Sequence, residues 1–170
     1  MLSRADVSRR DLPHYRVETD SARVDALCGW TDDAPTGVHA GELRVFGQRW
    51  NDYIRGMGGD LRRSLYQSAL EFETTEKAAA YFDRISRNCK GAAGQNGTVM
   101  FGWRYFRRVE SLGCTNGGKC EKVSYVLTRG PFMLTMSFAQ VSSGPHHESP
   151  QRTRQRADRY FATIKERIHV

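Results

Sequence analysis

The sequence predicts an α+β domain, a two-layer sandwich with two main helices on one face of an antiparallel sheet of about four to six strands. Three observations predict it. Several stretches alternate with a period of two, and two others place apolar residues at intervals of three and four. The links between the last three expected strands are short, which implies antiparallel pairing.

The composition is that of one domain, residues 1–170, with a hydrophobic core. Of the 170 residues, 39% are hydrophobic and 11% are aromatic, which argues against disorder. No apolar stretch approaches the roughly 20 residues that span a bilayer. The net charge is +7, but the basic residues form no continuous arm and no nucleic-acid-binding motif. We therefore expect no nucleic acid as partner.

Residues 1–60 are expected to form an irregular N-terminal part. Asp11-Leu12-Pro13 begins a short extended piece, because proline restricts the residue before it to extended geometry. Residues 31–41 are rich in Pro, Gly, Asp and Thr and indicate a loop, and a short strand is expected near Val45. The glycine-rich run 56–59 predicts a flexible break before the regular part begins.

Residues 61–170 are expected to form a β-α-β-β-β-α core. A strand over 64–73 leads to a helix that begins at Thr74 or Thr75 and ends at Cys89. Further strands are expected over 99–106, 122–128 and 132–138, and a closing amphipathic helix over 151–168. The apolar strand faces are expected to lie under both helices, and the polar faces on the opposite side of the sheet.

Four cysteines predict two disulfides and an oxidising compartment. Cys114 and Cys120 flank a glycine-containing turn that brings them together, so they can form a bridge across a hairpin. The remaining pair, Cys28 and Cys89, would join an early segment to the end of the first helix, a bridge worth about 4 kcal/mol in the loop-entropy model. Buried free thiols are the alternative. Zinc and redox sites are disfavoured because their usual C-x₂₋₄-C spacing is absent.

The polar side of the sheet is the expected ligand surface. Arg104 is suited to an anionic headgroup or carboxylate because its guanidinium is a planar fork of donors. Trp50 and Tyr53 are candidates for the wall of a cleft, whereas Trp103 and Tyr105 are expected in the core. The other candidate ligand-binding residues are Gln67, Ser124 and Thr135.

No catalytic constellation stands out, so no catalytic residue, metal or cofactor is predicted. The chain has no G-x-S-x-G nucleophile elbow. His146-His147-Glu148 is the only histidine cluster, and it is interpreted as a solvated loop in preference to a weak metal site. A small enzyme would need an inward-facing acid or base, for which the expected polar face offers mainly Glu71.

The chain resembles the family of the extracellular sensor domain of an actinobacterial serine/threonine kinase (PknH-like), which also occurs in secreted lipoproteins. The resemblance covers nearly the whole chain and is carried by loose apolar motifs: Asp11-Leu12-Pro13, an early Cys28, the strand end Glu71-Phe72-Glu73, and the helix from Thr75 to Cys89. Family members usually carry tryptophan just before the helix-end cysteine, where this chain has Asn88. The resemblance implies an α+β fold with a solvent-filled cleft, an extracellular ligand, and the disulfides Cys28–Cys89 and Cys114–Cys120.

The resulting hypothesis is an extracytoplasmic ligand-binding or sensor domain without catalytic activity. Its expected partner is a small-molecule or cell-envelope ligand, with an anionic one favoured, and membrane association is expected only through an anchor outside this chain. One alternative is a small enzyme of the isomerase or cyclase type that uses the concave sheet face as its pocket. The other is a secreted protein-interaction or inhibitor module.

Overall fold

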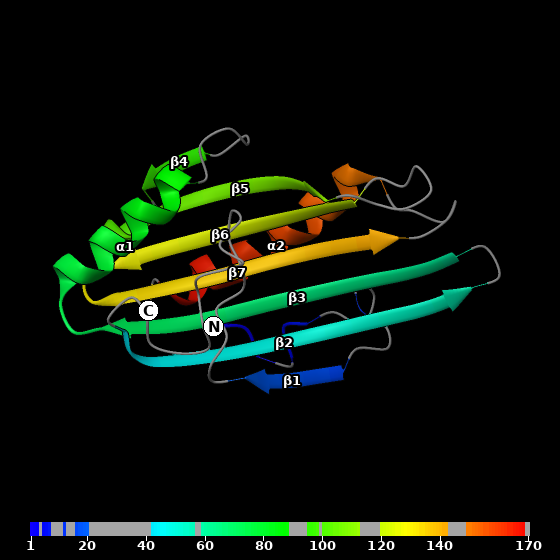
Figure 1. Cartoon of the computed structure of the whole chain (residues 1–170), viewed down its shortest axis with the longest axis horizontal. Coiled ribbons are helices and arrows are strands. Elements are labelled where there is room, and N and C mark those ends of the chain that lie inside the picture. The colour runs from blue at the N-terminus through cyan, green and yellow to red at the C-terminus, as the bar shows by residue number, and fades with distance from the viewer. Residues whose placement is uncertain are drawn as a thin grey trace.

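A sheet of seven antiparallel strands forms the centre of the molecule (Figure 1). The computed structural model describes residues 1–3, 5–7, 12, 16–20, 42–56, 59–88, 95–98, 100–112, 120–142 and 149–168. The strands are β1 (Arg16–Asp20), β2 (Glu42–Gly56), β3 (Gly59–Phe72), β4 (Gln95–Thr98), β5 (Arg104–Leu112), β6 (Cys120–Arg129) and β7 (Phe132–Ser142). The helices are α1 (Thr75–Asn88) and α2 (Pro150–Arg167), and a short 3₁₀ turn, η1, covers Met100–Gly102.

The strand order β1-β2-β3-β7-β6-β5-β4 joins two meanders side by side. The first is β1-β2-β3, and α1 carries the chain from β3 at the centre to β4 at the far edge. The second meander returns through β5 and β6 to β7, which pairs with β3. The predicted α+β class and antiparallel sheet are confirmed. The number of strands, seven, exceeds the expected four to six because two short strands, β1 and β4, form the edges of the sheet.

The prediction of an irregular segment up to residue 60 is wrong for β1 and β2. β2 is 15 residues long and pairs with β3 from Glu42 opposite Phe72 to Gly56 opposite Gly59. Charged and polar residues such as Arg49 and Asp52 occur on both faces of β2, so the strand lacks the alternation that marks a half-buried strand. Its pairing with β3 therefore decides its structure, and this pairing extends to Gly56 opposite Gly59, the two ends of the expected break.

The two helices pack on opposite faces of the sheet, which corrects the expected arrangement on one face. Val126 of β6 clusters with Phe82 and Ile85 of α1, whereas its neighbour Leu127 clusters with Ile164 of α2. Successive residues of a strand point to opposite faces, so the two helices cannot share one. Figure 1 shows α1 in front of the strands and α2 behind them.

We name the two faces after their helices. The α1 face carries Leu70, Phe72, Val126 and Met133 at the end of the sheet beside α1. The expectation of one polar face fails because the α1 face changes character along the strands: it is apolar under α1 and polar beyond it. Thr74 caps the N-terminus of helix α1, because its hydroxyl accepts a hydrogen bond from the Lys77 amide at 3.2 Å.

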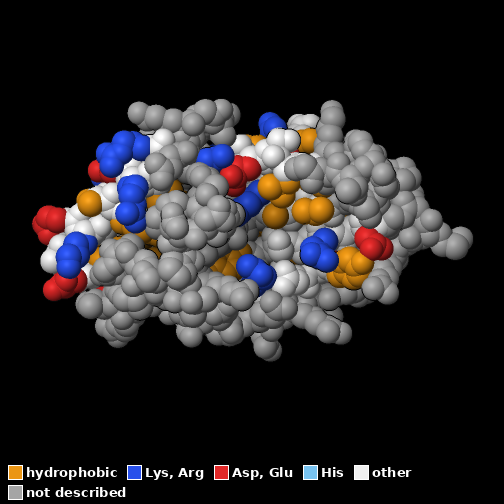
Figure 2. Space-filling view, in the orientation of Figure 1, with side chains coloured by type: hydrophobic (Ala, Val, Ile, Leu, Met, Phe, Trp, Pro, Cys, Tyr) orange, Lys and Arg blue, Asp and Glu red, His pale blue; other side chains and the backbone are white. Residues whose placement is uncertain are grey.

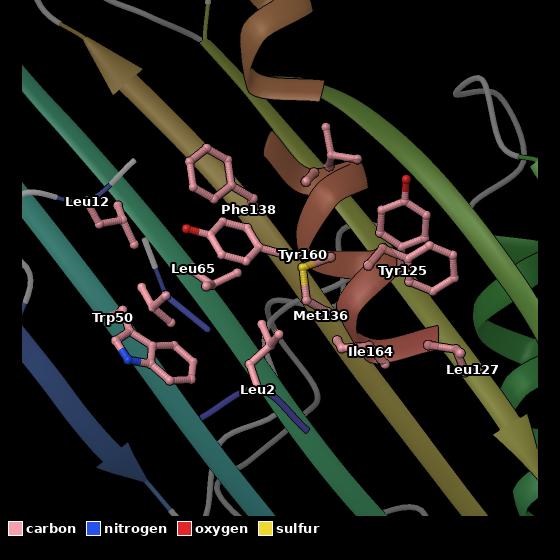
Figure 3. Packing of buried hydrophobic residues seen from close by; sticks show 14 residues of the cluster. Leu2, Leu12, Trp50, Leu65, Tyr125, Leu127, Met136, Phe138, Tyr160 and Ile164 are labelled. Carbon is pink, nitrogen blue, oxygen red and sulfur yellow. The ribbon is translucent and has the colours of Figure 1, made fainter. Parts of the chain in front are cut away.

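The α2 face holds the larger core cluster (Figure 3). Trp50, Leu65 and Phe138 are fully buried on neighbouring strands, and Tyr160 and Ile164 of α2 pack against this face. Leu2, Val7 and Leu12 belong to the same cluster. The N-terminal segment and α2 therefore cover the α2 face together.

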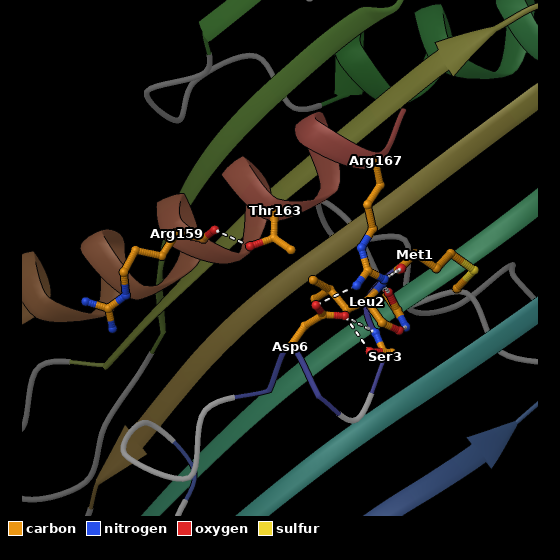
Figure 4. A network of polar contacts seen from close by, with 8 residues as sticks. Met1, Leu2, Ser3, Asp6, Arg159, Thr163 and Arg167 are labelled. Carbon is orange, nitrogen blue, oxygen red and sulfur yellow. Dashed lines mark hydrogen bonds and ion pairs between the residues drawn. The ribbon is translucent and has the colours of Figure 1, made fainter. Parts of the chain in front are cut away.

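A polar network fixes the N-terminal segment to the α2 face and to the end of α2 (Figure 4). Gln67 of β3 accepts a hydrogen bond from the Leu2 amide at 2.7 Å and donates one to the Leu2 carbonyl at 2.8 Å. Arg167 donates to the Met1 carbonyl at 2.7 Å and to the Asp6 carboxylate at 2.6 Å. Asp6 also accepts hydrogen bonds from the amide and hydroxyl of Ser3.

Replacing Asp6 with asparagine should lower the free energy of unfolding at neutral pH by about 1 kcal/mol. Partial burial alone would raise the pKa of Asp6, but the Ser3 hydrogen bonds and the charge of Arg167 hold this pKa below its usual value. Because the pKa of Asp6 is lower in the folded state than in the unfolded state, its ionised carboxylate stabilises the fold at pH values above the unfolded-state pKa. This stabilisation is lost as the pH falls through the folded-state pKa. Urea unfolding of the unsubstituted protein and the D6N variant should show that their free energies of unfolding differ less at pH 3 than at pH 7. An equal difference at both values would contradict this assignment.

The expected strand over 99–106 is interrupted, because η1 separates β4 from β5. Phe101 has φ 61° and Gly102 has φ 77°, both in the left-handed region that ends a strand. Thr98 then faces Arg104, so the two segments form a hairpin. Regular alternation in the sequence concealed this reversal.

Cys120 is the one cysteine within the described residues. It is buried at the start of β6 and is disulfide-bonded. The other three cysteines, Cys28, Cys89 and Cys114, lie outside the described residues, so the partner of Cys120 is not identified among the described residues. The pairings Cys114–Cys120 and Cys28–Cys89 therefore stay predictions.

Candidate functional site

A cavity of about 550 Å³ lies on the α1 face, beyond the part of the sheet that α1 covers. Its volume falls in the range of small-molecule sites. Strands β2, β3, β7 and β6 supply its floor. The residues that line it are Arg49, Asn51, Asp52, Tyr53, Arg62, Ser64, Tyr66, Lys122, Ser137 and Ala139.

Strand register arranges the floor in three rows that run across the sheet. The row nearest α1 contains Arg49, Tyr66 and Ser137 on β2, β3 and β7. The middle row contains Asn51, Ser64, Ala139 and Lys122, which extends it to β6. The outer row contains Tyr53 and Arg62. These positions share a face because each is two residues from the next along its strand.

The cavity is predominantly cationic. Arg49, Arg62 and Lys122 line it. Asp52 also borders the cavity, but it lies two residues from Trp50 and its side chain is therefore on the α2 face. The Asp52 side chain is fully buried and lies 3.7 Å from the Arg63 guanidinium, with which it forms an ion pair. This ion pair lies on the α2 face, so the charged lining side chains that face the cavity are cationic and favour an anion.

Two arginine–tyrosine stacks mark the two ends of the cavity floor. The Arg49 guanidinium lies 5.4 Å from the centre of the Tyr66 ring, and that of Arg62 lies 5.5 Å from the centre of the Tyr53 ring. The hydroxyl of Tyr53 donates a hydrogen bond to Asp60, which fixes the ring. Figure 2 looks onto this face and shows basic side chains (blue) next to side chains of the hydrophobic class, which includes Tyr (orange), beyond α1.

Of the six predicted ligand-binding residues, Tyr53 lines the cavity. Its side chain is 41% exposed, and it stands in the outer row. Arg104 is also on the α1 face but lies at α1, where it forms an ion pair with Asp83 and stacks over the Phe82 ring. Arg104 therefore joins the helix to the sheet, outside the cavity.

Ser124 and Thr135 lie on the α1 face between the cavity and α1. Thr135 is hydrogen-bonded to Ser68 at 2.5 Å, and both side chains are buried. Ser124 is buried beside Ser137 of the cavity floor, and its hydroxyl has no hydrogen-bond partner among the described residues. Neither predicted residue lines the cavity.

Trp50 and Gln67 are on the α2 face, which corrects their prediction as ligand-binding residues. Trp50 is fully buried in the core and forms no cleft wall. Gln67 is 1% exposed, and its amide binds the Leu2 main chain in place of a ligand. The sequence predicts Gln67 beside Arg104 and Ser124 because alternation assigns each of them to the polar face of its own strand. The register shows that it faces the opposite way.

Arg49, Arg62 and Lys122 are the lining residues that sequence reasoning missed. The first two lie on the β2–β3 hairpin, whose first strand shows no alternation in the sequence. Without that strand no cross-strand register can be written, and the stacks with Tyr66 and Tyr53 stay hidden. The sequence does offer one signal. The two strands carry similar patterns, Arg-x-Asn-x-Tyr at residues 49–53 of β2 and Arg-x-Ser-x-Tyr at residues 62–66 of β3.

The described part of the cavity offers binding groups and no evident acid–base pair. Its lining contains no histidine and no second carboxylate besides Asp52. The described residues also hold no group of three or more side chains placed to bind a metal ion. The histidine cluster at 146–148 lies outside the described residues.

Comparison with known proteins gave no match. No family model, no curated protein and no solved structure matches this chain. Among the described residues, neither helix has the length and apolar character needed to cross a membrane.

Proposed function

We propose that this protein is an extracytoplasmic ligand-binding or sensor domain that holds an anionic small molecule in the cavity on the α1 face. The observation that supports the proposal is the cationic lining: Arg49, Arg62 and Lys122 belong to the cavity floor, and the Asp52 carboxylate is paired with Arg63 on the α2 face. Charge-assisted hydrogen bonds from such groups to carboxylate, phosphate or sulfate are stronger than neutral ones.

The lining also suits a ligand with an organic body. Tyr53, which is 41% exposed, presents aromatic surface, while Asn51 and Ser64 supply short polar groups. A site of this kind binds the body through apolar contact and fixes its orientation through a few polar groups. Binding in place of turnover is proposed because the described lining contains no pair of titratable groups poised for proton transfer.

Cysteine chemistry and the resemblance to PknH-like sensor domains support the proposed extracytoplasmic location. Disulfide bonding of Cys120 supports an oxidising compartment. A sensor role in the cell envelope fits a domain whose cavity lies on one face of a sheet while the other face is occupied by core packing.

A thermal-unfolding screen at constant ionic strength tests this proposal. The probes are inorganic phosphate, citrate, azelate and nonanoate, with 1,9-nonanediol as the uncharged analogue of azelate. A ligand that binds only the folded state at about 100 times its Kd adds about 2.7 kcal/mol of stability, so its binding raises Tm. We expect at least one anion to raise Tm and the diol to leave it unchanged.

The matched variant removes both guanidiniums. The double substitution R49Q/R62Q should abolish the rise in Tm, while R84Q, which removes a stacked arginine on α1, should retain it. The proposal is wrong if no anion raises Tm, or if the double variant responds as the unsubstituted protein does.

A further inference from the structure

The two arginine–tyrosine stacks are related by an inverted register. In the row nearest α1, the arginine is on β2 and the tyrosine on β3 (Arg49 and Tyr66). In the outer row, the tyrosine is on β2 and the arginine on β3 (Tyr53 and Arg62). The middle row, with Ser64, lies between the stacks. The floor of the cavity therefore presents the same pair of groups at each end.

Each stack leaves its guanidinium able to bind an anion. The guanidinium carbon lies over the tyrosine ring, and this contact leaves N–H donors that can form a fork with an oxyanion. Among the described residues, neither Arg49 nor Arg62 forms an ion pair. By contrast, six other arginines have carboxylate partners: Arg63, Arg104, Arg107, Arg108, Arg154 and Arg167.

The separation of the stacks excludes one small anion as a shared ligand. Positions 49 and 53 are four residues apart on β2, which corresponds to about 13 Å. Both arginines reach across the hairpin to the tyrosine directly opposite, so neither side chain extends along the strands toward the other. Fork-like hydrogen bonds need about 2.9 Å between donor and acceptor atoms, and a single carboxylate or phosphate cannot meet both guanidiniums at that distance.

We infer that the cavity takes an elongated dianion, whose two acidic groups bind Arg49 and Arg62 and whose body lies over the middle row. This inference rests on the proposed function and specifies its ligand class. Asn51 and Ser64 are short, so the floor between the stacks leaves room for the body, and the exposed Tyr53 ring provides apolar contact near one end. Lys122, at the far end of the middle row, adds a positive charge beside the body.

Calorimetric titration of the whole chain with a length series tests the inference. The series is succinate, azelate and dodecanedioate, with nonanoate and inorganic phosphate as single-group controls. Azelate or dodecanedioate should bind about tenfold or more tightly than nonanoate, because a second charge-assisted fork forms. Succinate is too short to reach both stacks and should bind no better than nonanoate.

Single variants locate the two ends. R49Q and R62Q should each reduce the affinity for the long dianion to about that for nonanoate, and R84Q, which removes an Arg84–Tyr81 stack outside the cavity, should leave it unchanged. The length series needs no variant, so it decides the question even if a variant fails to fold. Phosphate, succinate or nonanoate binding as tightly as the long dianions would overturn the dianion inference and leave the proposed function standing. Absence of binding by every anion would overturn both.

Discussion

Replacement of Trp50 with alanine is expected to lower the free energy of unfolding by about 3–5 kcal/mol. Trp50 is fully buried on the α2 face, opposite Leu65 on β3 and within the cluster that includes Leu2 and Phe138 (Figure 3). Removing its indole ring leaves a cavity among side chains that α2 and the N-terminal segment hold in place. Urea unfolding followed by circular dichroism measures the loss.

Two matched variants separate core packing from a role in the cavity. Tyr53 lies three residues along the same strand but on the α1 face, and Y53A should cost less than about 1 kcal/mol because the side chain is 41% exposed. W50F should cost less than W50A because it retains a ring and removes an indole N–H that has no acceptor among the described residues. A W50A protein as stable as Y53A would contradict the assignment of Trp50 to the core.

Replacement of Gln67 with leucine is expected to cost about 2–4 kcal/mol. The Gln67 side chain binds both the N–H and the C=O of Leu2 in a buried setting, so leucine would leave two main-chain groups without their partners. Each unsatisfied buried group costs about 1–3 kcal/mol. Leucine and glutamine side chains have similar volumes, so the lost hydrogen bonds account for most of the expected decrease in the free energy of unfolding.

Gln151 provides the control for this prediction, because it is an exposed glutamine on α2. Q151L should change the free energy of unfolding by no more than about 0.5 kcal/mol. Amide hydrogen exchange gives a second measure, since loss of the Gln67 contacts should release protection at Leu2 in Q67L. Equal stability of Q67L and Q151L would show that the N-terminal segment does not depend on this contact.

The sequence predicted the second half of the fold better than the first for a physical reason. β6, β7, α1 and α2 carry regular apolar periodicity in the sequence, because apolar residues recur every second residue in the strands and every third and fourth in the helices. β2 carries no such signal. Its long pairing with β3 depends on main-chain hydrogen bonds and on partners distant in sequence, which local pattern cannot indicate.

The same limit explains why most of the predicted ligand-binding residues lie outside the cavity. Tyr53 was found from its residue type alone, but its partner Arg62 and the second stack, Arg49 with Tyr66, require the hairpin register. Alternation assigns residues to two faces within a strand without showing which faces of different strands coincide. Gln67 and Ser124 were for this reason placed on one surface, although the sheet separates them.

The most direct test of the account is arginine side-chain NMR during titration with azelate. The Nε–Hε signals of Arg49 and Arg62, assigned by their absence in R49Q and R62Q, should both shift and saturate together, while the signal of Arg84 stays unchanged. That result would place one dianion across the two stacks in the cavity on the α1 face. Saturating shifts confined to other arginines, such as the exposed Arg152 on α2, with none at Arg49 or Arg62, would contradict it.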